Sequence, residues 1–503
     1  MSAPAPLIVV SIPAASPAEA RRQIDAIASA RADLVEIRFD FWSPEARLRV
    51  AEIFPSRLPL IATLRSRAEG GRGPDDPVER AAILEALARH PFRWLDLESE
   101  RDLGLLDRLP PAAASGRILS VHYPNGTSPE TWGTQLRVPV AGGCVRKVVA
   151  RAEIGPFLRD LLPRVPPPGE QVVVALTIGP SGPLSRAWAR RIGVPMVYAA
   201  PPTGAGRETP IPPVEPSQVP VDRLEPFLHA DGAPPLFGLA GHPVAHSLSP
   251  RIHGQWMARM RRPGLYVPLD FASESEFLGA LEDLASGGFR GLNVTHPWKG
   301  AALEAATEVS HGAEICGVAN TLTFRGESID AENTDLAAIL RRLEELKSTG
   351  SWSGGSLSVV GAGGAARATL AAARALGAEA RVYARRPGAA VEVAEIFGAE
   401  PRAADDPRPD DLVVHATFAG REGAGTLAVP LQGLIRPGGR VLDWVYAADS
   451  SEIRESAERA GATYEDGRRL LVYQAAASFG VWWGEEPSRE ALAAALEEVG
   501  CTA

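Results

Sequence analysis

The feature that most constrains the fold is an alternation of short apolar runs with Ala-, Leu- and Arg-rich segments over residues 7–199. The runs are rich in β-branched residues and predict eight strands: Leu7–Ile12, Leu34–Phe39, Leu60–Leu64, Arg93–Leu97, Arg117–Val121, Val145–Ala150, Val172–Ile178 and Met196–Ala199. The segments between them, such as 17–30, 77–90 and 154–162, have a helical composition. Strands joined by such crossovers form a parallel sheet, and eight of them close into a (β/α)8 barrel. We therefore expect an α/β fold that begins with a barrel over residues 1–230.

Charged side chains stand at several strand ends of this predicted barrel. They are Glu36, Arg38, Arg65, Glu69, His122, Lys147 and Arg186. One such charge is as readily explained by a structural ion pair as by function. However, catalytic residues of these barrels lie at the C-terminal strand ends. The convergence of so many charges on one mouth predicts an active site.

Lysine is rare in this chain, which has three lysines among 52 basic residues. Arginine stays protonated, whereas a desolvated lysine can attack a carbonyl or donate a proton. Lys347 ends an amphipathic helical pattern and is expected to be a solvated charge, but Lys147 and Lys299 stand in apolar, Gly-rich surroundings. This contrast suggests two active sites, each built around one lysine. The alternative is that two lysines survived a compositional drift by chance.

The barrel residues suit imine chemistry. We expect neighbouring arginines and apolar walls to favour a neutral Lys147, which could attack a ketone. His122 can move protons near neutral pH, with Glu69 placed to orient it. Several arginines imply an anionic substrate held through its carboxylate.

The motifs Glu36-x-Arg38-x-Asp40, Arg65-x-x-x-Glu69-Gly-Gly, Ser120-Val-His122, Lys147-Val-Val-Ala and Ser185-Arg186 resemble type I 3-dehydroquinate dehydratase. The resemblance implies that Lys147 forms a Schiff base, that His122 moves protons and that Glu69 orients His122. It also implies that Arg186 holds the carboxylate, that Glu36, Arg38 and Arg65 shape the pocket, and that this half needs no cofactor.

Two departures from that family stand out. The family closes its site with an Ala-Pro-Gly-Gln-like loop after strand eight, whereas Ala199–Arg207 has no glutamine in register. Cys144 replaces an acidic residue three positions before the lysine.

The composition excludes several other classes. A net charge of −9 disfavours nucleic acid or an anionic membrane as a partner. The N-terminus lacks a secretory pattern, no apolar run is long enough to span a membrane, and the histidines show no metal-ligand spacing. Three scattered cysteines fit a reducing cytoplasm. A Pro-rich stretch over 201–235 predicts a domain boundary near residue 230.

A nucleotide-binding lobe in the second half of the chain is predicted by the glycine turn between a strand at 356–360 and an Ala-rich helix. Its residues are Gly361, Ala362, Gly363, Gly364 and Ala365. This GxGxxA pattern places phosphate at a helix N-terminus. The next strand ends in Arg385 and Arg386, which suit a 2′-phosphate and favour NADP(H) over NAD. Later strands at 412–417, ending in Thr417, and at 441–446 continue a Rossmann lobe over 338–467.

Between the barrel and this lobe lie motifs rich in uncharged hydrogen-bonding groups. Ser249 and Pro250 suggest the N-cap and first residue of a helix, and Pro297 suggests the start of a helix that carries Lys299 in its first turn. The helix dipole disfavours a positive charge at a helix N-terminus, so a simple surface lysine would be unusual at this position.

The second half, residues 235–500, resembles shikimate dehydrogenase. The resemblance is carried by His246-Ser-Leu-Ser-Pro, Asn293-Val-Thr-x-Pro-x-Lys299, Ala319-Asn-Thr, Asn333-Thr-Asp335 and the glycine turn. It implies a catalytic dyad of Lys299 and Asp335, a substrate lobe over 235–337, and helices over 468–503 that complete that lobe. It further implies a set of substrate-binding residues: Ser247, Ser249, Asn293, Thr295, Asn320, Tyr446 and Gln474. Ala384-Arg385-Arg386 departs from the family's Asn-Arg-Thr by losing the Asn.

Together the two resemblances imply a bifunctional enzyme of the shikimate pathway, with 3-dehydroquinate, 3-dehydroshikimate and shikimate as its small-molecule partners. A dehydrogenase that prefers quinate, or accepts both substrates, is the alternative. A remoter one is a non-catalytic quinate-sensing regulator, which should have lost catalytic residues and gained a DNA-binding module.

Overall fold

The computed structural model describes residues 5–110, 115–140, 144–167, 173–203, 210–417, 419, 429–446 and 452–501. The chain divides into two compact units. One comprises Met1–Gly238, His242–Ala245 and Pro263–Phe289, and the other Leu239–Gly241, His246–Arg262 and Arg290–Ala503. The finer boundaries near residues 230, 337 and 467 stay predictions.

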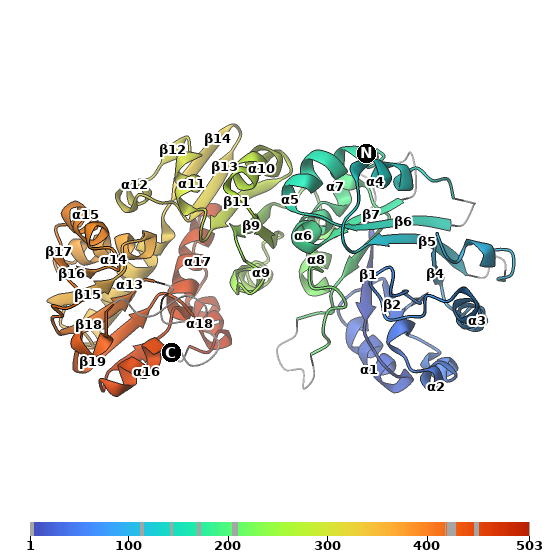
Figure 1. The fold of residues 1–503 in the computed structure, drawn as a ribbon, viewed down its shortest axis with the longest axis horizontal. Helices are drawn as coiled ribbons and strands as arrows, with labels where there is room; N and C mark the ends of the chain where they lie inside the picture. The colour runs from blue at the N-terminus through green and yellow to red at the C-terminus, as the bar shows by residue number, and fades with distance from the viewer. Residues whose placement is uncertain are drawn as a thin grey trace. The chain divides into compact units, whose positions relative to one another are not determined.

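The predicted barrel is confirmed as a parallel sheet that is nearly closed (Figure 1). Its described strands are β1 (Leu7–Ile12), β2 (Leu34–Arg38), β3 (Leu60–Thr63), β4 (Trp94–Glu98), β5 (Gly116–Tyr123), β6 (Cys144–Arg151), β7 (Val173–Ile178) and β8 (Met196–Ala199). Neighbours in sequence pair in parallel from β1 to β7, and β8 returns to pair with β1. The strands are buried on both faces, as expected when helices surround a parallel sheet.

Helices of the barrel begin where the sequence supplies caps. The hydroxyl of Ser16 caps α1 (Pro17–Ala28), and the carboxylate of Asp76 caps α3 (Pro77–Leu87). In both helices proline occupies the first position, where a missing N–H costs nothing. The predicted helix at 154–162 is wrong in detail. A short α5 (Ile154–Pro156) passes into a wider π-helical turn over Phe157–Leu161.

A mixed six-stranded sheet follows, with the order β10-β9-β11-β13-β14-β12. Its strands are β9 (Leu236–Gly241), β10 (Leu265–Asp270), β11 (Phe289–Val294), β12 (Glu308–Val309), β13 (Thr321–Arg325) and β14 (Ser328–Glu332). The C-terminal helix α17 (Arg468–Trp483) packs on this sheet, where Trp482 donates a hydrogen bond to the carbonyl of Leu322, 3.1 Å away. The helix that begins at Arg468 thus returns to this sheet, and its place in a substrate-binding lobe stays a prediction.

The last sheet is parallel, with the order β17-β16-β15-β18-β19-β20. Its strands are β15 (Ser356–Val360), β16 (Glu379–Tyr383), β17 (Glu400–Arg402), β18 (Asp410–His415), β19 (Ile435–Asp443) and β20 (Thr463–Glu465). From β15 the sheet continues through β16 and β17 on one side, and through β18, β19 and β20 on the other. Ligands of such sheets bind outside the strand ends where this switch occurs.

Candidate active sites

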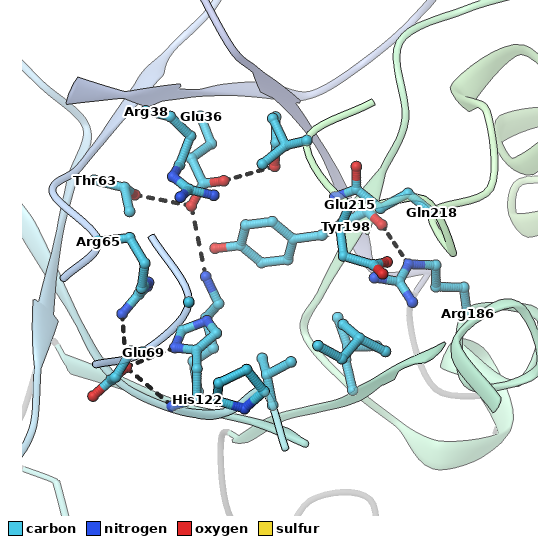
Figure 2. Close-up of a pocket in the computed structure, with 18 residues that line it drawn as sticks. Glu36, Arg38, Thr63, Arg65, Glu69, His122, Arg186, Tyr198, Glu215 and Gln218 are labelled. Carbon is cyan, nitrogen blue, oxygen red and sulfur yellow. Dashed lines mark hydrogen bonds and ion pairs between the residues drawn. The ribbon is translucent and has the colours of Figure 1, made fainter. Parts of the chain in front are cut away.

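The mouth of the barrel holds a cavity of about 150 Å³ (Figure 2). All seven charged residues predicted for this mouth line it: Glu36, Arg38, Arg65, Glu69, His122, Lys147 and Arg186. They come from five different strand ends or the segments that follow them, so the barrel alone brings them together.

Lys147 lies in the wall of this cavity on β6. Its Nζ is 3.1 Å from Asp96 Oδ2, 3.6 Å from Glu36 Oε1 and 4.0 Å from the centre of the Tyr198 ring. The expected arginines and apolar residues line the same cavity, but the charges nearest to the Lys147 ammonium are carboxylates, which the sequence did not predict. Burial alone would raise the pKa of Asp96. Arg65, Lys147 and a hydrogen bond from Ser120 outweigh burial and lower that pKa to about 2.

His122 is held through its backbone and its ring by one carboxylate oxygen. Glu69 Oε2 accepts from the His122 N–H at 3.0 Å and lies 3.0 Å from His122 Nδ1. Burial and the nearby charges of Arg65, Lys147 and Arg38 lower the pKa of His122 well below its ordinary value. Burial, opposed by Arg65, raises the pKa of Glu69 to about 7. When Glu69 is ionised, it accepts the Nδ1 proton and leaves a lone pair on Nε2, which makes His122 a base.

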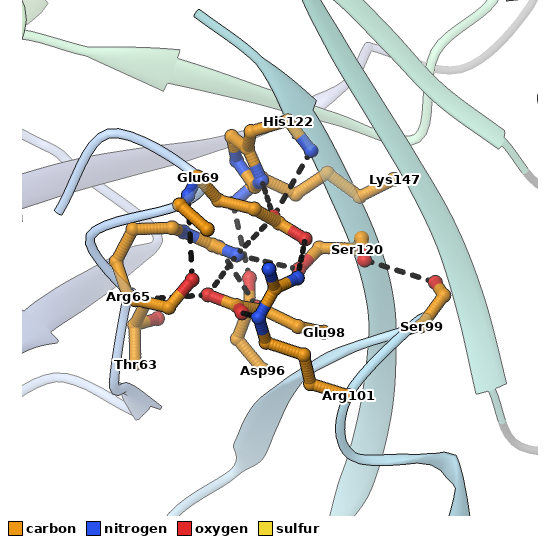
Figure 3. A network of polar contacts seen from close by, with 12 residues as sticks. Thr63, Arg65, Glu69, Asp96, Glu98, Ser99, Arg101, Ser120, His122 and Lys147 are labelled. Carbon is orange, nitrogen blue, oxygen red and sulfur yellow. Dashed lines mark hydrogen bonds and ion pairs between the residues drawn. The ribbon is translucent and has the colours of Figure 1, made fainter. Parts of the chain in front are cut away.

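Arg65 is the centre of a buried network (Figure 3). Its Nη1 donates to Glu69, Glu98 and Ser120 at 3.0–3.2 Å, and its Nη2 donates to Asp96 at 2.9 Å. These contacts hold the carboxylate of Glu69 in place beside His122. A direct contact of Arg65 with substrate stays a prediction.

Arg186 is a buried cation that no described carboxylate pairs with. Its Nε donates to the carbonyl of Tyr198 at 2.8 Å, and its Nη1 donates to the carbonyls of Thr177 and Gly182 at 2.9 and 2.8 Å. Burial lowers the pKa of Arg186 to about 10, with Glu215 opposing. No described residue accepts from its Nη2, so the guanidinium fits a substrate carboxylate.

The structure places one polar residue in this cavity that the sequence reasoning missed. Residues 204–207 of the altered loop lie outside the described residues, but Gln218 lines the cavity farther along the chain, close to Glu215 (Figure 2). Pro216-Ser217-Gln218 stands close to the expected Ala-Pro-Gly-Gln pattern once a longer loop is allowed before it. Residues 199–207 hold no glutamine, as expected, but Gln218 brings one to the cavity from farther along the chain.

A second lysine centre lies in the other unit. Lys299 begins α11 (Lys299–Glu304), and its Nζ is 2.5 Å from Oδ2 of Asp335. Asp335 stands in the first turn of α13 (Thr334–Ser348), where the helix dipole favours a carboxylate. Asn320 donates to Asp335 Oδ1 at 2.9 Å, which leaves Oδ2 for the lysine. The predicted pair thus forms, with Lys299 in the first turn but Pro297 just outside the helix.

The residues predicted to bind substrate in this unit differ in their burial and in their hydrogen-bond partners. Asn293 is buried and donates to the hydroxyl of Thr321 at 3.1 Å. The prediction that Ser249 caps a helix is wrong. Ser249 is the first residue of α9 (Ser249–Arg259), and its N–H donates to the hydroxyl of Ser247 at 3.2 Å. The amide of Gln474 donates to the carbonyl of Leu471 in its own helix, at 2.9 Å.

Two further residues predicted to bind substrate are Thr295 and Tyr446. The backbone N–H of Thr295 donates to the carbonyl of Ala240 at 2.8 Å, which fixes the segment before Lys299. Tyr446 follows β19 and is half-buried, and residues 447–450 lie outside the described part of the chain.

The sequence reasoning missed His253, which packs against Trp256. Burial, opposed by a hydrogen bond with Asn293, lowers the pKa of His253 to about 3.

A cavity of about 490 Å³ lies at the carboxyl ends of β15 and β16. Of the predicted cofactor residues, six line it: Gly361, Ala362, Gly363, Arg385, Arg386 and Thr417. Gly361 has φ +132°, and a Cβ there would lie 2.7 Å from the carbonyl oxygen of Ala416. Gly363 precedes α14 (Gly364–Ala375) without a side-chain cap, so the N–H groups at this helix start are open to a phosphate. The residues present therefore fit a dinucleotide that carries an additional phosphate.

Gly364 and Ala365 do not line this cavity. A Cβ on Gly364 would lie 2.8 Å from Val318, so this glycine permits close packing rather than ligand contact. The sequence reasoning missed Arg367 and Glu392, which line the cavity and pair at 2.9 Å.

Within the described ranges, no cluster of His, Cys, Asp and Glu could hold a metal ion. Nor does any helix among them have the length and apolar character to span a membrane.

Fold and sites together define an α/β enzyme. A parallel barrel carries one lysine centre, and a two-lobed dehydrogenase carries the other. Residues 8–234 match the family model "Type I 3-dehydroquinase", and residues 239–322 match "Shikimate dehydrogenase substrate binding domain". The NADP(+) shikimate dehydrogenase of Ruegeria sp. is 36% identical over 261 residues, which cover 50% of this chain and 94% of that protein. The corresponding enzyme of Paracoccus denitrificans is 37% identical over 277 residues, covering 53% and 95%.

The chain therefore belongs to the shikimate dehydrogenase family, and a type I 3-dehydroquinase domain precedes the part that matches it. A structure of dehydroquinate dehydratase and shikimate dehydrogenase from S. pombe also matches, at 21% identity and a TM-score of 0.45, over 99% of this chain and 98% of that one. The family models and the shikimate dehydrogenase relatives thus confirm the two family resemblances stated from the sequence.

Proposed function

We propose that this chain catalyses two successive steps of the shikimate pathway. The barrel dehydrates 3-dehydroquinate to 3-dehydroshikimate, and the second half reduces that product to shikimate with NADPH. The observation that carries the proposal is that each of the two lysines lies against its own proton-handling partners, with Lys147 near the His122–Glu69 pair and Lys299 on Asp335.

In the barrel, the neutral amine of Lys147 attacks the substrate ketone, and loss of water gives an iminium. His122 Nε2 then removes a proton from the carbon next to the iminium, and the resulting enamine expels the β-hydroxyl, to which His122 returns the proton as water leaves. Hydrolysis of the new iminium frees Lys147. The buried Arg186 holds the carboxylate, and Glu36, Arg38 and Gln218 contribute polar groups to the same cavity.

In the second half, Lys299 protonates, or donates a hydrogen bond to, the oxygen of the carbonyl that is reduced. Asp335 fixes the ammonium at 2.5 Å, and Asn320 in turn fixes Asp335. Bound NADPH supplies the hydride. Ser247, Ser249, Asn293, Thr295, Tyr446 and Gln474 are proposed to bind the carboxylate and hydroxyls of the substrate.

The cofactor preference is proposed from the end of β16. Arg385 and Arg386 line the cavity where an NAD enzyme would place an acid for the ribose hydroxyl. These two arginines support NADP(H) over NAD, whereas the N–H groups at the start of α14 suit the pyrophosphate that both nucleotides carry. The three cysteines are free thiols, which supports a cytoplasmic location for the enzyme.

The test uses the purified full chain with separate assays for each half. Incubation with 3-dehydroquinate alone should yield 3-dehydroshikimate, and addition of NADPH should carry the product on to shikimate. Oxidation of shikimate and of quinate, each with NADP and with NAD, measures the preference of the second site. Failure to consume 3-dehydroquinate would contradict the assignment of the barrel. Faster oxidation of quinate than of shikimate would make quinate the preferred substrate of the second site.

A further inference from the structure

Two oxygen atoms in the charged network below the barrel mouth lack hydrogen bonds. Glu69 Oε1 and Glu98 Oε2 are both buried, and neither has a hydrogen-bond partner among the described residues. An unsatisfied buried carboxylate oxygen is costly, so such atoms call for an electrostatic explanation. Both belong to residues that Arg65 already contacts through their other oxygen.

One side chain faces both of these oxygens. Arg101 Nη1 lies 4.0 Å from Glu69 Oε1, and Arg101 Nε lies 3.9 Å from Glu98 Oε2 (Figure 3). These distances are too long for hydrogen bonds, but they are short enough for a strong charge interaction beside buried groups. The side chain of Arg101 is 27% exposed, so it covers the carboxylates from the solvent side.

The turn after β4 fixes the position of Arg101. The N–H groups of Arg101 and Asp102 both donate to the carbonyl of Glu98, at 3.1 and 2.8 Å. The carboxylate of Asp102 accepts from the Glu98 N–H at 2.8 Å and from Arg80 at 2.7 Å. Arg101 is thus anchored at a strand end rather than in a free loop.

The charge balance of the network gives Arg101 its importance. The carboxylates joined by ion pairs are Glu36, Glu69, Asp96, Glu98 and Asp102, and the other cations among them are Arg65, Arg80 and Lys147. Carboxylates are therefore in excess without Arg101. Glu69 faces Arg65 beyond β3, Asp96 and Glu98 on β4, and His122 on β5.

We propose that Arg101 is a positioning residue of the dehydratase site, which holds Glu69 ionised through its free oxygen so that His122 presents a basic Nε2. This inference rests on the dehydratase function proposed above. If Glu69 is protonated, its hydroxyl donates to Nδ1, the ring proton moves to Nε2, and His122 cannot remove the substrate proton. Arg101 then determines the pH below which the barrel stops working. It does so without touching the substrate.

Buried Glu69, with a pKa raised to about 7, supports this inference, because its charge is marginal at neutral pH. An opposite charge at this distance shifts a carboxyl pKa by about one unit or more. Loss of Arg101 therefore moves the acid limb of dehydration to higher pH by about one unit, a tenfold loss of rate on that limb.

The experiment measures kcat/KM for dehydration against pH in the full-length wild type, R101Q and R101K. The control is R108Q, which removes an exposed arginine from the same segment after β4. We expect R101Q to move the acid limb upward by about one pH unit and to keep the high-pH plateau. R101K and R108Q should keep the wild-type limb. In an E69Q background, R101Q should shift nothing further. Shikimate oxidation by the second half of the same molecules serves as the folding check.

Two outcomes would overturn the inference. One is an acid limb in R101Q at the wild-type pH, and the other is an equal shift in R101K, which would assign the effect to packing rather than to charge. A wild-type chain that does not dehydrate 3-dehydroquinate would instead contradict the proposed function, so the two failures are distinguishable.

Discussion

Lys299 Nζ and Asp335 Oδ2 lie 2.5 Å apart, although the two residues stand in the first turns of different helices, α11 and α13. The helix starts bring the pair together, and Asn320 ties the second carboxylate oxygen. The ammonium is therefore positioned in advance for a substrate oxygen rather than dispersed on a surface.

Replacement of Lys299 by alanine should lower kcat for shikimate oxidation by about 10²–10⁴-fold, because the positioned group that takes up the hydroxyl proton in the oxidation, and returns it in the reduction, is lost. NADPH affinity, measured by fluorescence titration, should stay near wild type. The matched control is Lys347→Ala, since Lys347 is exposed at the end of α13. Loss of NADPH binding in Lys299→Ala would assign this lysine a structural role.

The dehydratase rate should fall as pH drops through about 7. Burial raises the pKa of Glu69 to about that value, so the ionised form that orients His122 dominates only above it. The pKa of His122 lies well below its ordinary value, so its own protonation belongs at lower pH. A pH–rate profile that stays flat from pH 8 down to pH 6 would rule out this assignment.

The same raised pKa makes a prediction for folding. A carboxyl whose pKa rises on folding stabilises the protein fully below its unfolded pKa, and this contribution is lost as pH rises through about 7. Glu69→Gln should therefore lower the dehydration rate. Compared with the wild type, it should also raise the resistance of the barrel to urea, and this gain should be larger at pH 8 than at pH 5. An equal effect of the substitution at both pH values would argue against a buried, titrating Glu69.

Arg385→Gln and Arg386→Gln should each weaken NADP binding by about 10–100-fold, the value of a hydrogen bond to a charged group. Binding of NAD, which lacks the 2′-phosphate, should change little. Isothermal titration with both nucleotides separates the two cases. A parallel loss for NADP and NAD would show that the arginines shape the cavity instead of recognising the phosphate.

Gly361→Ala should weaken nucleotide binding by about 10–100-fold, because the added Cβ would meet the carbonyl of Ala416 at 2.7 Å in a backbone of positive φ. Such strain costs about 1–3 kcal/mol. Gly388→Ala is the control, since its Cβ would meet nothing within 4 Å. Tight NADP binding by Gly361→Ala would mean that the turn tolerates a side chain.

The barrel could be predicted because each strand has a β-branched run of its own, and the bounds of β1 and β8 agree with the expected ones. Residues that share a motif were also found, such as Asn293 and Lys299. Their contact distances could not be predicted, since the Lys299–Asp335 pair joins positions 36 residues apart.

Residues that act only through the folded network were missed. Asp96 and Glu98 look like ordinary polar residues of a strand in the sequence. In the fold, Asp96 meets Lys147 from two strands away and Glu98 meets Arg65 beyond the neighbouring strand. Gln218 was missed because a longer loop separates it from β8, so a fixed register failed. Ser249 and Pro250 fit a cap by pattern, but the helix starts one residue earlier and uses the hydroxyl of Ser247.

The most direct test of the central claim is borohydride reduction of the full chain in the presence of 3-dehydroquinate, followed by peptide mass mapping. A Schiff-base dehydratase should carry the reduced substrate adduct on Lys147 alone, and Lys147→Ala should carry none while still oxidising shikimate. An adduct on another residue, or none on a chain that retains its dehydrogenase activity, would contradict the account.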